Sequence, residues 1–341
     1  MSKLSVLMIV AKYPATHGHT TVINNLCREL NNMGHRAAIG AFSFDREPPY
    51  SIEKVVLSKS KLLRHGVQYL DFDIIHTHQS RVNYYLLSVK PKKPIILHYH
   101  GASNLIQRLN FKLMMALYKN KITKIISVSG AGITQMKNMI RKVQADVLYN
   151  GVDTDFYSPE LPDKYKKGDP QLLFVSALRH YKNTSMLIDA IPKLVQKYPN
   201  IHLQIVGTGE DYENLKQQIQ KNHLEKNVEL IGKIPDDELR FRYSSCDLYV
   251  SASKFEVCPV PTLEAMSAAK PLVLFDIEPH KEIVDESGAG VIFSSIDNIT
   301  EKITEAYENK KSLSIAARKF AENHSWKNIC NQLVQIYQSV L

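Results

Sequence analysis

The chain has 341 residues, of which 44% are hydrophobic and 23% charged, an ordinary globular composition that excludes disordered and fibrous proteins and predicts about two domains. Its longest apolar run, at residues 6–11, is far shorter than the ~20 residues of a membrane span, and no basic region with a long apolar core follows Met1, so we expect a cytoplasmic protein. The four cysteines form no CxxC pair and are expected to be reduced.

The net charge of +9 is unevenly distributed along the chain. Residues 1–150 hold 21 Lys and Arg against 7 Asp and Glu, whereas the remainder holds 22 against 27. This asymmetry favours an anionic partner for the N-terminal half: a nucleic acid, a phosphorylated substrate or an anionic membrane surface. A solvated basic surface with no partner is the alternative. Because no nucleic-acid-reading motif is present, we do not expect nucleic acid as a partner.

Short Val- and Ile-rich runs alternate with helical patterns in the N-terminal half. The runs lie at residues 6–10, 37–42, 74–75, 95–97, 125–128 and 147–148. Strands with continuous apolar runs are buried on both faces, so this alternation predicts a parallel sheet with helices on either side.

Histidines alternate along two of these expected strands, His76 with His78 and His98 with His100. Alternate residues of a strand point to the same side of the sheet, so the four imidazoles can in principle form a metal site. Only Asp73 stands near enough in the sequence to add an acidic ligand, and a cluster without metal is the favoured interpretation.

Residues 105–121 have the spacing of an amphipathic helix. Leucines recur at positions 105, 109, 113 and 117, and basic residues stand at 108, 112, 119 and 121. Such a helix can lie on an anionic membrane, where each basic residue contributes ~1 kcal/mol. The alternative is an ordinary core helix whose outer face is charged.

The alternation of strands and helices restarts in the second half, with apolar runs at 172–175, 203–206, 228–231, 248–250, 272–275 and 291–293. The polar stretch 158–170 between the two series is expected to be a linker. We therefore expect an N-terminal domain at 1–157, a C-terminal domain at 171–324, and a C-terminal helix at 325–341 that can pack back on the N-terminal domain. The predicted fold class is α/β, with two doubly wound Rossmann-like domains that face each other across a cleft.

The most informative segment, residues 255–266, follows an expected strand and leads into a helix. Because proline fits the first helical turn, the helix is expected to begin near Pro259 or Pro261. Glu256 then lies in the loop and Glu264 lies one turn into the helix, with free N–H groups and the positive end of the helix dipole between them. This predicts a phosphate site flanked by two carboxylates. The alternative is one solvated glutamate and one helix-start glutamate.

This stretch resembles the E-x7-E motif of retaining nucleotide-sugar glycosyltransferases with the GT-B fold, in particular family 4 (glycosyl transferases group 1). The family's other markers occur in order over most of the chain: Pro14 with Gly18, Gly34 with His35, Asp73 through His78, His98 through Gly101, Asn150 through Asp153, Lys182 with Asn183, Gly207 with Gly209, Cys246 with Asp247, and Glu282.

The resemblance implies three catalytic residues, Glu256, His100 and Lys182. Glu256 would hold hydroxyl groups of the donor sugar, and His100 would reach the sugar beside the reacting carbon. Lys182 would neutralise the diphosphate, whose developing charge is the main target of catalysis in such a transfer.

The resemblance also implies donor-binding residues. Glu264 would hold the ribose, the backbone N–H of Leu263 would donate to a phosphate, and Gly18 would belong to the loop that closes over the phosphates. The family's arginine five residues before the lysine is Ala177 here, and Arg179 is the nearest substitute.

Two further positions depart from the family pattern: Pro259 replaces the last glycine of the usual E-G-F-G run, and His17 replaces the first glycine of an N-terminal pair. Pro259 has no N–H to donate. His17 would bring an imidazole near the acceptor or the phosphates.

Other chemistries fit the sequence less well. The pair Gly207 and Gly209 suggests dinucleotide binding, but the third glycine is missing. The segments 71–73 and 153–155 imitate a metal-binding DxD motif but lie inside the family markers. A retaining hydrolase would need two carboxylates ~5 Å apart, whereas Glu256 and Glu264 are expected to flank a phosphate.

We therefore expect a retaining hexosyltransferase that uses a UDP- or GDP-sugar, with no cofactor and no essential metal. Its acceptor would be a hydroxyl of a glycan or lipid-linked precursor in cell-envelope glycan biosynthesis, and the protein would be peripheral at the inner face of the membrane. A nucleotide-sugar epimerase or hydrolase of the same fold, or a non-catalytic nucleotide-sugar-binding homologue, is the alternative. The base, sugar, linkage and oligomeric state are not readable from the residues.

Overall fold

The computed structural model describes residues 3–15 and 18–341, and the chain folds into two compact units. The first comprises Met1–Gly151 and Trp326–Leu341, and the second comprises Val152–Ser325. The chain thus leaves the first unit at Gly151, before the stretch 158–170 that the sequence suggests as a linker. That stretch is held within the second unit, where the Tyr165 N–H donates to the Ser245 hydroxyl at 3.0 Å.

The first unit contains a sheet of seven parallel strands in the order β5-β3-β1-β6-β7-β8-β9. The strands are β1 (Ser5–Ile9), β3 (Arg36–Ala41), β5 (Glu53–Val56), β6 (Ile74–Thr77), β7 (Ile95–Tyr99), β8 (Lys124–Ser127) and β9 (Asp146–Val147). A separate short pair joins β2 (Lys12–Tyr13) to β4 (Ser43–Phe44). The central strands are buried along almost their whole length, as their continuous apolar runs predict.

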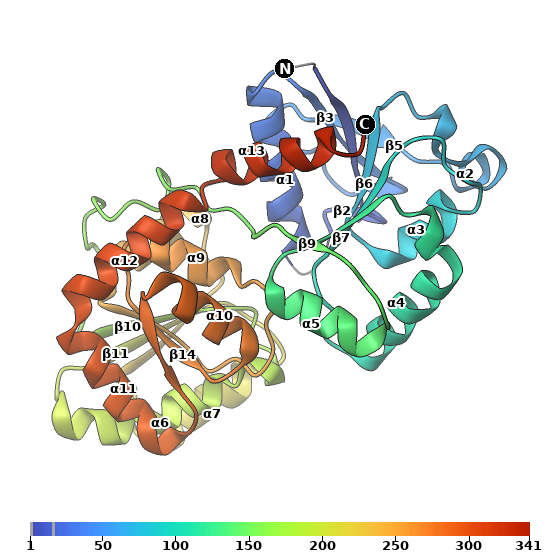
Figure 1. The fold of residues 1–341 in the computed structure, drawn as a ribbon. Helices are drawn as coiled ribbons and strands as arrows, with labels where there is room; N and C mark the ends of the chain where they lie inside the picture. Colours follow the sequence, from blue (N-terminus) through green and yellow to red (C-terminus); the bar gives the residue numbers. More distant parts are fainter. Residues whose placement is uncertain (1–2, 16–17) are drawn as a thin grey trace. The chain divides into compact units, whose positions relative to one another are not determined.

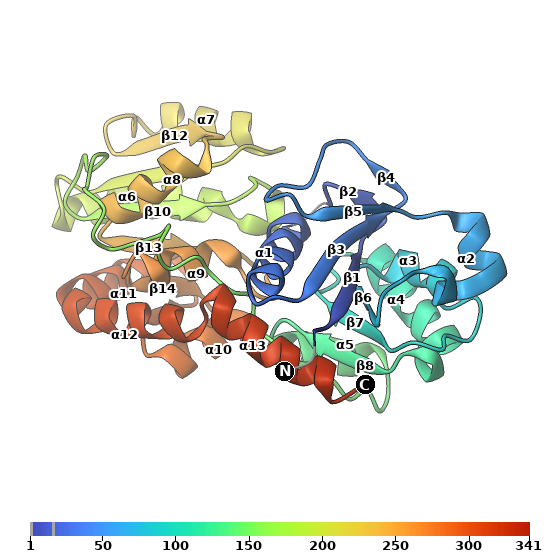
Figure 2. The same ribbon diagram turned by 90° about the horizontal axis from the view of Figure 1, so that it is seen from above.

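Helices cover both faces of the first sheet (Figures 1 and 2). One face carries α1 (His19–Asn32) and α13 (Trp326–Gln338), which share a core with the sheet and contact each other. The other face carries α2 (Lys59–His65), α3 (Ser80–Leu86), α4 (Leu105–Tyr118) and α5 (Gly130–Met139), with the 3₁₀ turns η1 (Gly66–Tyr69) and η2 (Lys119–Lys121). The last helix of the chain is therefore part of the unit that the chain begins.

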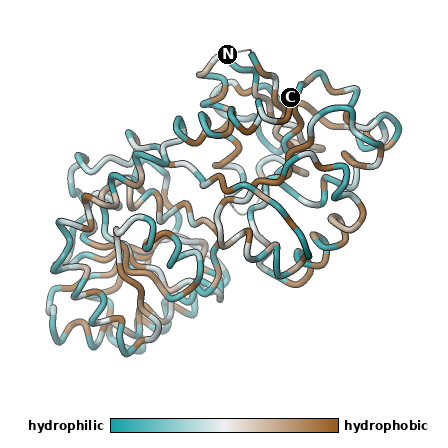
Figure 3. Tube along the Cα trace, viewed as in Figure 1, coloured by the Kyte–Doolittle hydropathy of each residue, from teal (hydrophilic) through white to brown (hydrophobic). Residues whose placement is uncertain are grey.

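The second unit contains six parallel strands in the order β12-β11-β10-β13-β14-β15. The strands are β10 (Gln171–Val175), β11 (His202–Val206), β12 (Val228–Gly232), β13 (Leu248–Ser251), β14 (Leu272–Phe275) and β15 (Gly290–Phe293). This is the 3-2-1-4-5-6 order of doubly wound sheets. Figure 3 shows these apolar strands gathered in the interior of the unit.

Helices also cover both faces of the second sheet. One face carries α6 (Thr184–Lys197), α7 (Tyr212–Lys221) and α11 (Ile296–Glu308). The other carries α8 (Asp236–Ser245), α9 (Val260–Ser267), α10 (Glu278–Ser287) and α12 (Lys310–Asn323). A short 3₁₀ turn, η3 (His180–Lys182), follows β10. The predicted α/β class with two Rossmann-like domains is confirmed.

The strand order of each sheet reverses beside its first strand, between β1 and β6 in the first unit and between β10 and β13 in the second. Open α/β sheets bind ligands at such a switch point, beyond the carboxyl ends of the strands. Lys182 and Glu256 follow β10 and β13, and His78 follows β6. Among the described residues, no helix combines the length and the apolar character needed to cross a membrane.

Candidate functional site

Lys182 and Glu256 form an ion pair at the switch point of the second unit. Lys182 ends the turn η3, and Glu256 lies in the loop between β13 and α9. The ammonium Nζ lies 2.5 Å from Glu256 Oε1, and the two side chains are only 15% and 13% exposed. The two loops are joined by their backbones as well, since the Lys254 N–H donates to the Tyr181 carbonyl at 2.8 Å. Two residues 74 positions apart in the sequence are thus held together in the fold.

His280 interacts electrostatically with both members of this pair, and no sequence motif predicted it. It is fully buried in the first turns of α10, where its Nδ1 is 2.8 Å from the Phe275 carbonyl oxygen. Burial lowers the pKa of His280, Glu256 opposes that shift, and Lys182 adds to it. The imidazole is therefore neutral at physiological pH. No sequence signal marks it, apart from its position two residues before Glu282.

Glu264 lies in α9 and is almost fully buried, at 9% exposure. The Tyr243 hydroxyl donates to its Oε2 at 2.8 Å, and Tyr157 supplies a second side-chain hydrogen bond. Burial raises the pKa of Glu264 to about 7, and the two tyrosine hydrogen bonds oppose that shift. The carboxyl is thus held by two tyrosine side chains, and the phosphate site expected between Glu256 and Glu264 stays a prediction. Neither tyrosine carries a motif that identifies it in advance.

The start of α9 agrees with its expected position. The helix begins at Val260 after Pro259, whose carbonyl accepts a hydrogen bond from the Thr262 N–H at 3.2 Å. The Leu263 side chain is fully buried in the core, so only its backbone can meet a ligand. Arg179 stands just before η3, with one guanidinium nitrogen 3.5 Å from the Tyr181 hydroxyl.

Gly207 and Gly209 have a structural explanation. A Cβ at Gly207 would lie 1.8 Å from the Ser176 carbonyl oxygen, and a Cβ at Gly209 would lie 2.2 Å from that of Leu178. The loops after β10 and β11 therefore pack backbone to backbone, which requires glycine at both places. The glycine pair shapes the loop that leads to Lys182 and is not a dinucleotide fingerprint.

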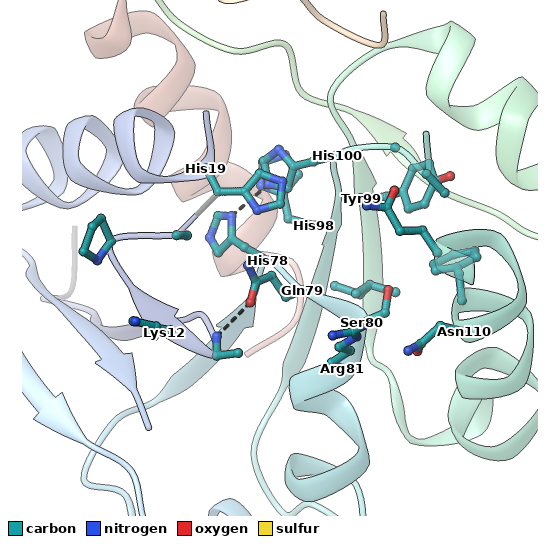
Figure 4. Close-up of a pocket in the computed structure, with 18 residues that line it drawn as sticks. Lys12, His19, His78, Gln79, Ser80, Arg81, His98, Tyr99, His100 and Asn110 are labelled. Carbon is teal, nitrogen blue, oxygen red and sulfur yellow. Dashed lines mark hydrogen bonds between the residues drawn. The ribbon is translucent and has the colours of Figure 1, made fainter. Parts of the chain in front are cut away.

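The first unit holds a pocket of about 390 Å³ at its own switch point (Figure 4). The residues that line it come from the segment after β1, the starts of α1 and α3, the loop after β6, strand β7 with the loop after it, and one face of α4: Ala11, Lys12, Pro14, Ala15, His19, residues 78–81 and 97–102, Gln107, Asn110 and Phe111. Figure 4 shows the imidazoles of this set grouped on one side, with Arg81 and Asn110 elsewhere. The pocket thus combines a basic and an imidazole-rich lining.

His100 belongs to a compact imidazole cluster. Its ring centroid lies 4.4 Å from that of His98 and 4.5 Å from that of His19. Its Nε2 lies 2.9 Å from the Nδ1 of His78, and His76 continues the cluster with its ring 4.5 Å from that of His78. Burial and the neighbouring imidazoles lower the pKa of the cluster members, so the rings are neutral at physiological pH.

Gly18 caps the N-terminus of α1 with a left-handed φ of 78°, and nothing lies within 4 Å of where its Cβ would be. A residue with a side chain would be strained there, although space is available. The structure thus brings Gly18 and His100 into one unit, and Lys182, Glu256, Glu264, Arg179 and Leu263 into the other. His17 lies outside the described residues.

Two doubly wound Rossmann-like units in one chain are the architecture of the GT-B class, and comparison with known proteins gives the family. The model of glycosyl transferases group 1 matches residues 159–324, and that of glycosyltransferase family 4 matches residues 16–156. Together they span nearly all of the chain. The protein belongs to this glycosyltransferase family.

Individual relatives are distant. An uncharacterized glycosyltransferase of Methanocaldococcus jannaschii is 25% identical over 99% of both chains. The phosphatidyl-myo-inositol mannosyltransferase of Mycobacterium tuberculosis is 23% identical over 82% of this chain and 76% of its own. Among solved structures, Anabaena HepE in complex with UDP and glucose superposes with a TM-score of 0.82 at 19% identity, covering 98% of this chain and all of that one. This likeness extends over both units and supports the GT-B fold.

Proposed function

We propose that the protein is a retaining hexosyltransferase that moves a sugar from a nucleoside-diphosphate sugar to a hydroxyl of a glycan or lipid-linked acceptor, without an essential divalent ion. The Lys182–Glu256 pair carries the proposal. A buried ammonium suits a diphosphate, and a buried carboxylate suits sugar hydroxyl groups. The HepE structures, one with UDP and glucose and one with UDP-glucose, support a diphosphate-sugar donor of this kind.

Lys182 and Glu256 contact different parts of the donor when it binds. Lys182 exchanges Glu256 for the diphosphate and neutralises the charge that grows as the sugar leaves. Glu256, released from the ammonium, accepts hydroxyl groups of the sugar, and Glu264 accepts those of the ribose once it is ionised. His100 contacts the sugar, and the backbone N–H of Leu263, with Arg179 and Gly18, completes the phosphate contacts.

The transfer retains the anomeric configuration. The bond from the anomeric carbon to the diphosphate oxygen breaks, and the acceptor oxygen forms its bond to that carbon on the same face. The proton of the acceptor hydroxyl passes to the departing phosphate oxygen. No protein nucleophile takes part in this scheme.

A donor panel tests the proposal. UDP-, GDP-, ADP- and TDP-sugars are added to the purified protein in EDTA, and the melting temperature is measured. A ligand at 100 times its Kd adds ~2.7 kcal/mol to the free energy of unfolding. One diphosphate sugar should stabilise the protein, and Lys182→Ala should abolish the shift. Lys216→Ala, an exposed lysine of α7, is the matched control. NMR of the product should show the donor's anomeric configuration.

The two alternatives give different outcomes when consumption of the stabilising donor is also measured. An epimerase or hydrolase would consume the donor rapidly with no acceptor present. A non-catalytic homologue, which Ala177 in place of the family arginine leaves open, would bind the donor without turnover. Inversion of the anomeric centre, or a flat panel of melting temperatures, would overturn the proposal.

The acceptor side is proposed from helix α4, whose outward face is apolar. Five large aliphatic side chains of this helix are 55–68% exposed: Leu105, Ile106, Leu109, Leu113 and Leu117. The helix buries Phe111, Met114 and Met115 instead. The alternative of a core helix whose leucines face the core is therefore wrong. A row of exposed leucines on one helix is typical of a surface that binds a membrane.

Charge identifies which membrane the helix would bind. The exposed Arg108 and Lys112 fall on one row of the helical wheel beside the leucines, and the exposed Lys119 follows the helix in η2. All three lie in the half of the chain that carries the excess of basic residues. The same helix presents Gln107, Asn110 and Phe111 to the pocket. We infer that α4 rests on an anionic membrane surface and brings the pocket to a lipid-linked acceptor. The name of the mannosyltransferase relative, which includes a phosphatidylinositol, agrees with a lipid acceptor.

Vesicle sedimentation tests this membrane contact. The protein should sediment with vesicles of anionic lipid at low salt and be released at high salt, whereas zwitterionic vesicles should bind it weakly. Leu109→Ser with Leu113→Ser should abolish the binding. Ile315→Ser, an equally exposed residue of α12, should not. Unchanged recovery of the protein in the supernatant with anionic vesicles at low salt would contradict the inference.

A further inference from the structure

Three buried histidines beneath the pocket have ring nitrogens without partners. Within the described part of the chain, His76 Nε2, His78 Nε2 and both nitrogens of His98 are buried and form no hydrogen bond. The three side chains are at most 3% exposed. A buried nitrogen without a hydrogen-bond partner destabilises the folded state, so the cluster is costly to fold unless something occupies its centre. The donor contacts proposed above use none of these three residues, and no specific acceptor contact is assigned to them.

The three rings lie close together. One ligand atom from each of His76, His78 and His98 lies within 4.8 Å of the other two. In a tetrahedral zinc site, with Zn–N bonds of 2.0–2.1 Å, neighbouring ligand nitrogens are about 3.3 Å apart. The rings of His78 and His98 stack on that of His76 at interplanar angles of 27° and 13°, so binding one cation requires these rings to tilt toward a common point.

The other ring nitrogens of His76 and His78 are already held. His76 Nδ1 lies 2.6 Å from the Tyr337 hydroxyl, and His78 Nδ1 lies 2.9 Å from His100 Nε2. If Nδ1 carries the proton in both rings, Nε2 keeps its lone pair, and Nε2 is the atom without a partner. Metal-ligating histidines are oriented in this way by a hydrogen bond to the second nitrogen.

We propose that His76, His78 and His98 bind a divalent cation of the zinc class at the base of the first unit's pocket. Three neutral imidazoles are a known ligand set for zinc, with the fourth position left to water or to a bound molecule. His78 and His98 also line the pocket (Figure 4), whereas His76 is not among its lining residues. Tyr337 is a positioning residue, because it orients His76 from helix α13. This cation site is separate from the proposed donor site and is not required for the transfer.

Cobalt and zinc titrations of the full-length chain test the proposal. The protein, made without a histidine tag and dialysed against chelator, is titrated with Co²⁺ while its visible absorption is recorded. One Co²⁺ per chain should bind with the strong absorption of a tetrahedral site, and Zn²⁺ should displace it. His98→Asn should weaken binding at least about 100-fold, whereas His65→Asn, an exposed histidine of the same unit, should leave it unchanged.

A second variant covers the case in which His98→Asn fails to fold. Tyr337→Phe removes only the hydroxyl that orients His76 and should weaken cation binding about 10- to 100-fold. Binding that is unchanged in both variants would place the metal elsewhere, and the absence of saturable Zn²⁺ or Co²⁺ binding to the parent chain would leave water as the occupant; either result overturns the proposal. These metal-binding measurements do not require that the sugar donor be identified.

Discussion

Glu264 ionises only near neutral pH, because burial raises its pKa from 4.5 to about 7. Between these two pH values the folded protein holds a proton that the unfolded chain has lost. The contribution of Glu264 to stability is therefore fully present below pH 4.5 and declines as pH rises to 7, by about 3 kcal/mol at most. Urea unfolding across this range should show Glu264→Gln gaining stability relative to the parent chain as pH rises.

The comparison has a matched control and a functional counterpart. Glu301→Gln, on the exposed side of α11, should show no such trend. Because a carboxylate accepts hydrogen bonds from ribose hydroxyl groups more strongly than a protonated carboxyl does, the affinity of the parent chain for the nucleotide should rise through the same pH window. A constant difference between Glu264→Gln and the parent at all pH values would show that the carboxyl is ionised throughout.

Lys182 and Glu256 should be energetically coupled, since each loses its partner when the other is removed from a site that is only 13–15% exposed. A double-mutant cycle with Lys182→Met and Glu256→Gln, measured by urea unfolding, should give a coupling of about 1–3 kcal/mol, between the values for surface and buried pairs. The Lys302–Glu305 pair of α11, whose side chains are 28% and 44% exposed, is the control, with an expected coupling below about 0.5 kcal/mol. Equal coupling in the two cycles would contradict a special role for the buried pair.

At the scale of elements, the sequence predicts most strands because their apolar runs are continuous. The expected run at 272–275 coincides with β14, and those at 203–206 and 95–97 lie within β11 and β7. The edge strand β5 has no such run, since it is mostly exposed and includes Glu53 and Lys54, and the pattern missed it. Periodicity also predicted helix α4 but could not decide which of its two apolar rows faces the core.

The candidate site was predictable where a motif identifies residues by spacing, and not where burial decides. The resemblance pointed to Lys182 and Glu256, and the structure joins them. Tyr243 and His280 come from helices α8 and α10, and only the packing of those helices brings them to Glu264 and to the ion pair. Their positions depend on tertiary contacts between distant segments, which a single sequence does not encode as a local pattern.

Helix α13 is an element on which the first unit depends. Six of its side chains are buried: Trp326, Ile329, Cys330, Leu333, Val334 and Tyr337. At ~1.5–3 kcal/mol for each large apolar side chain, their removal costs about as much as the whole stability of a typical domain. A chain ending at Ser325 should lose the cooperative unfolding of the first unit and expose surface to a hydrophobic dye. A chain ending at Gln338 lacks only three residues beyond the helix and should behave as the parent; native-like unfolding of the shorter chain would contradict the prediction.

At the scale of the whole molecule, the two units use the chain differently. The second unit is one continuous segment, Val152–Ser325, whereas the first needs both ends of the chain. The second unit also has its own cores on both faces of its sheet and contains Lys182, Glu256 and Glu264. The single segment Val152–Ser325 therefore contains a complete folding unit and most of the proposed donor contacts.

This difference predicts how fragments behave. The segment 152–325, expressed alone, should unfold cooperatively in urea and bind the nucleoside diphosphate of the preferred donor, detected by calorimetry, because the diphosphate and ribose contacts assigned to Lys182 and Glu264 are all present. The segment 1–151 should remain unfolded or aggregate, because α1 and the first sheet lack their cover from α13. Fusing residues 326–341 to the end of 1–151 should restore folding, since Gly151 and Trp326 already pack against each other in the intact chain. If 1–151 folds without this helix, α13 is an accessory to the first unit and not part of its core.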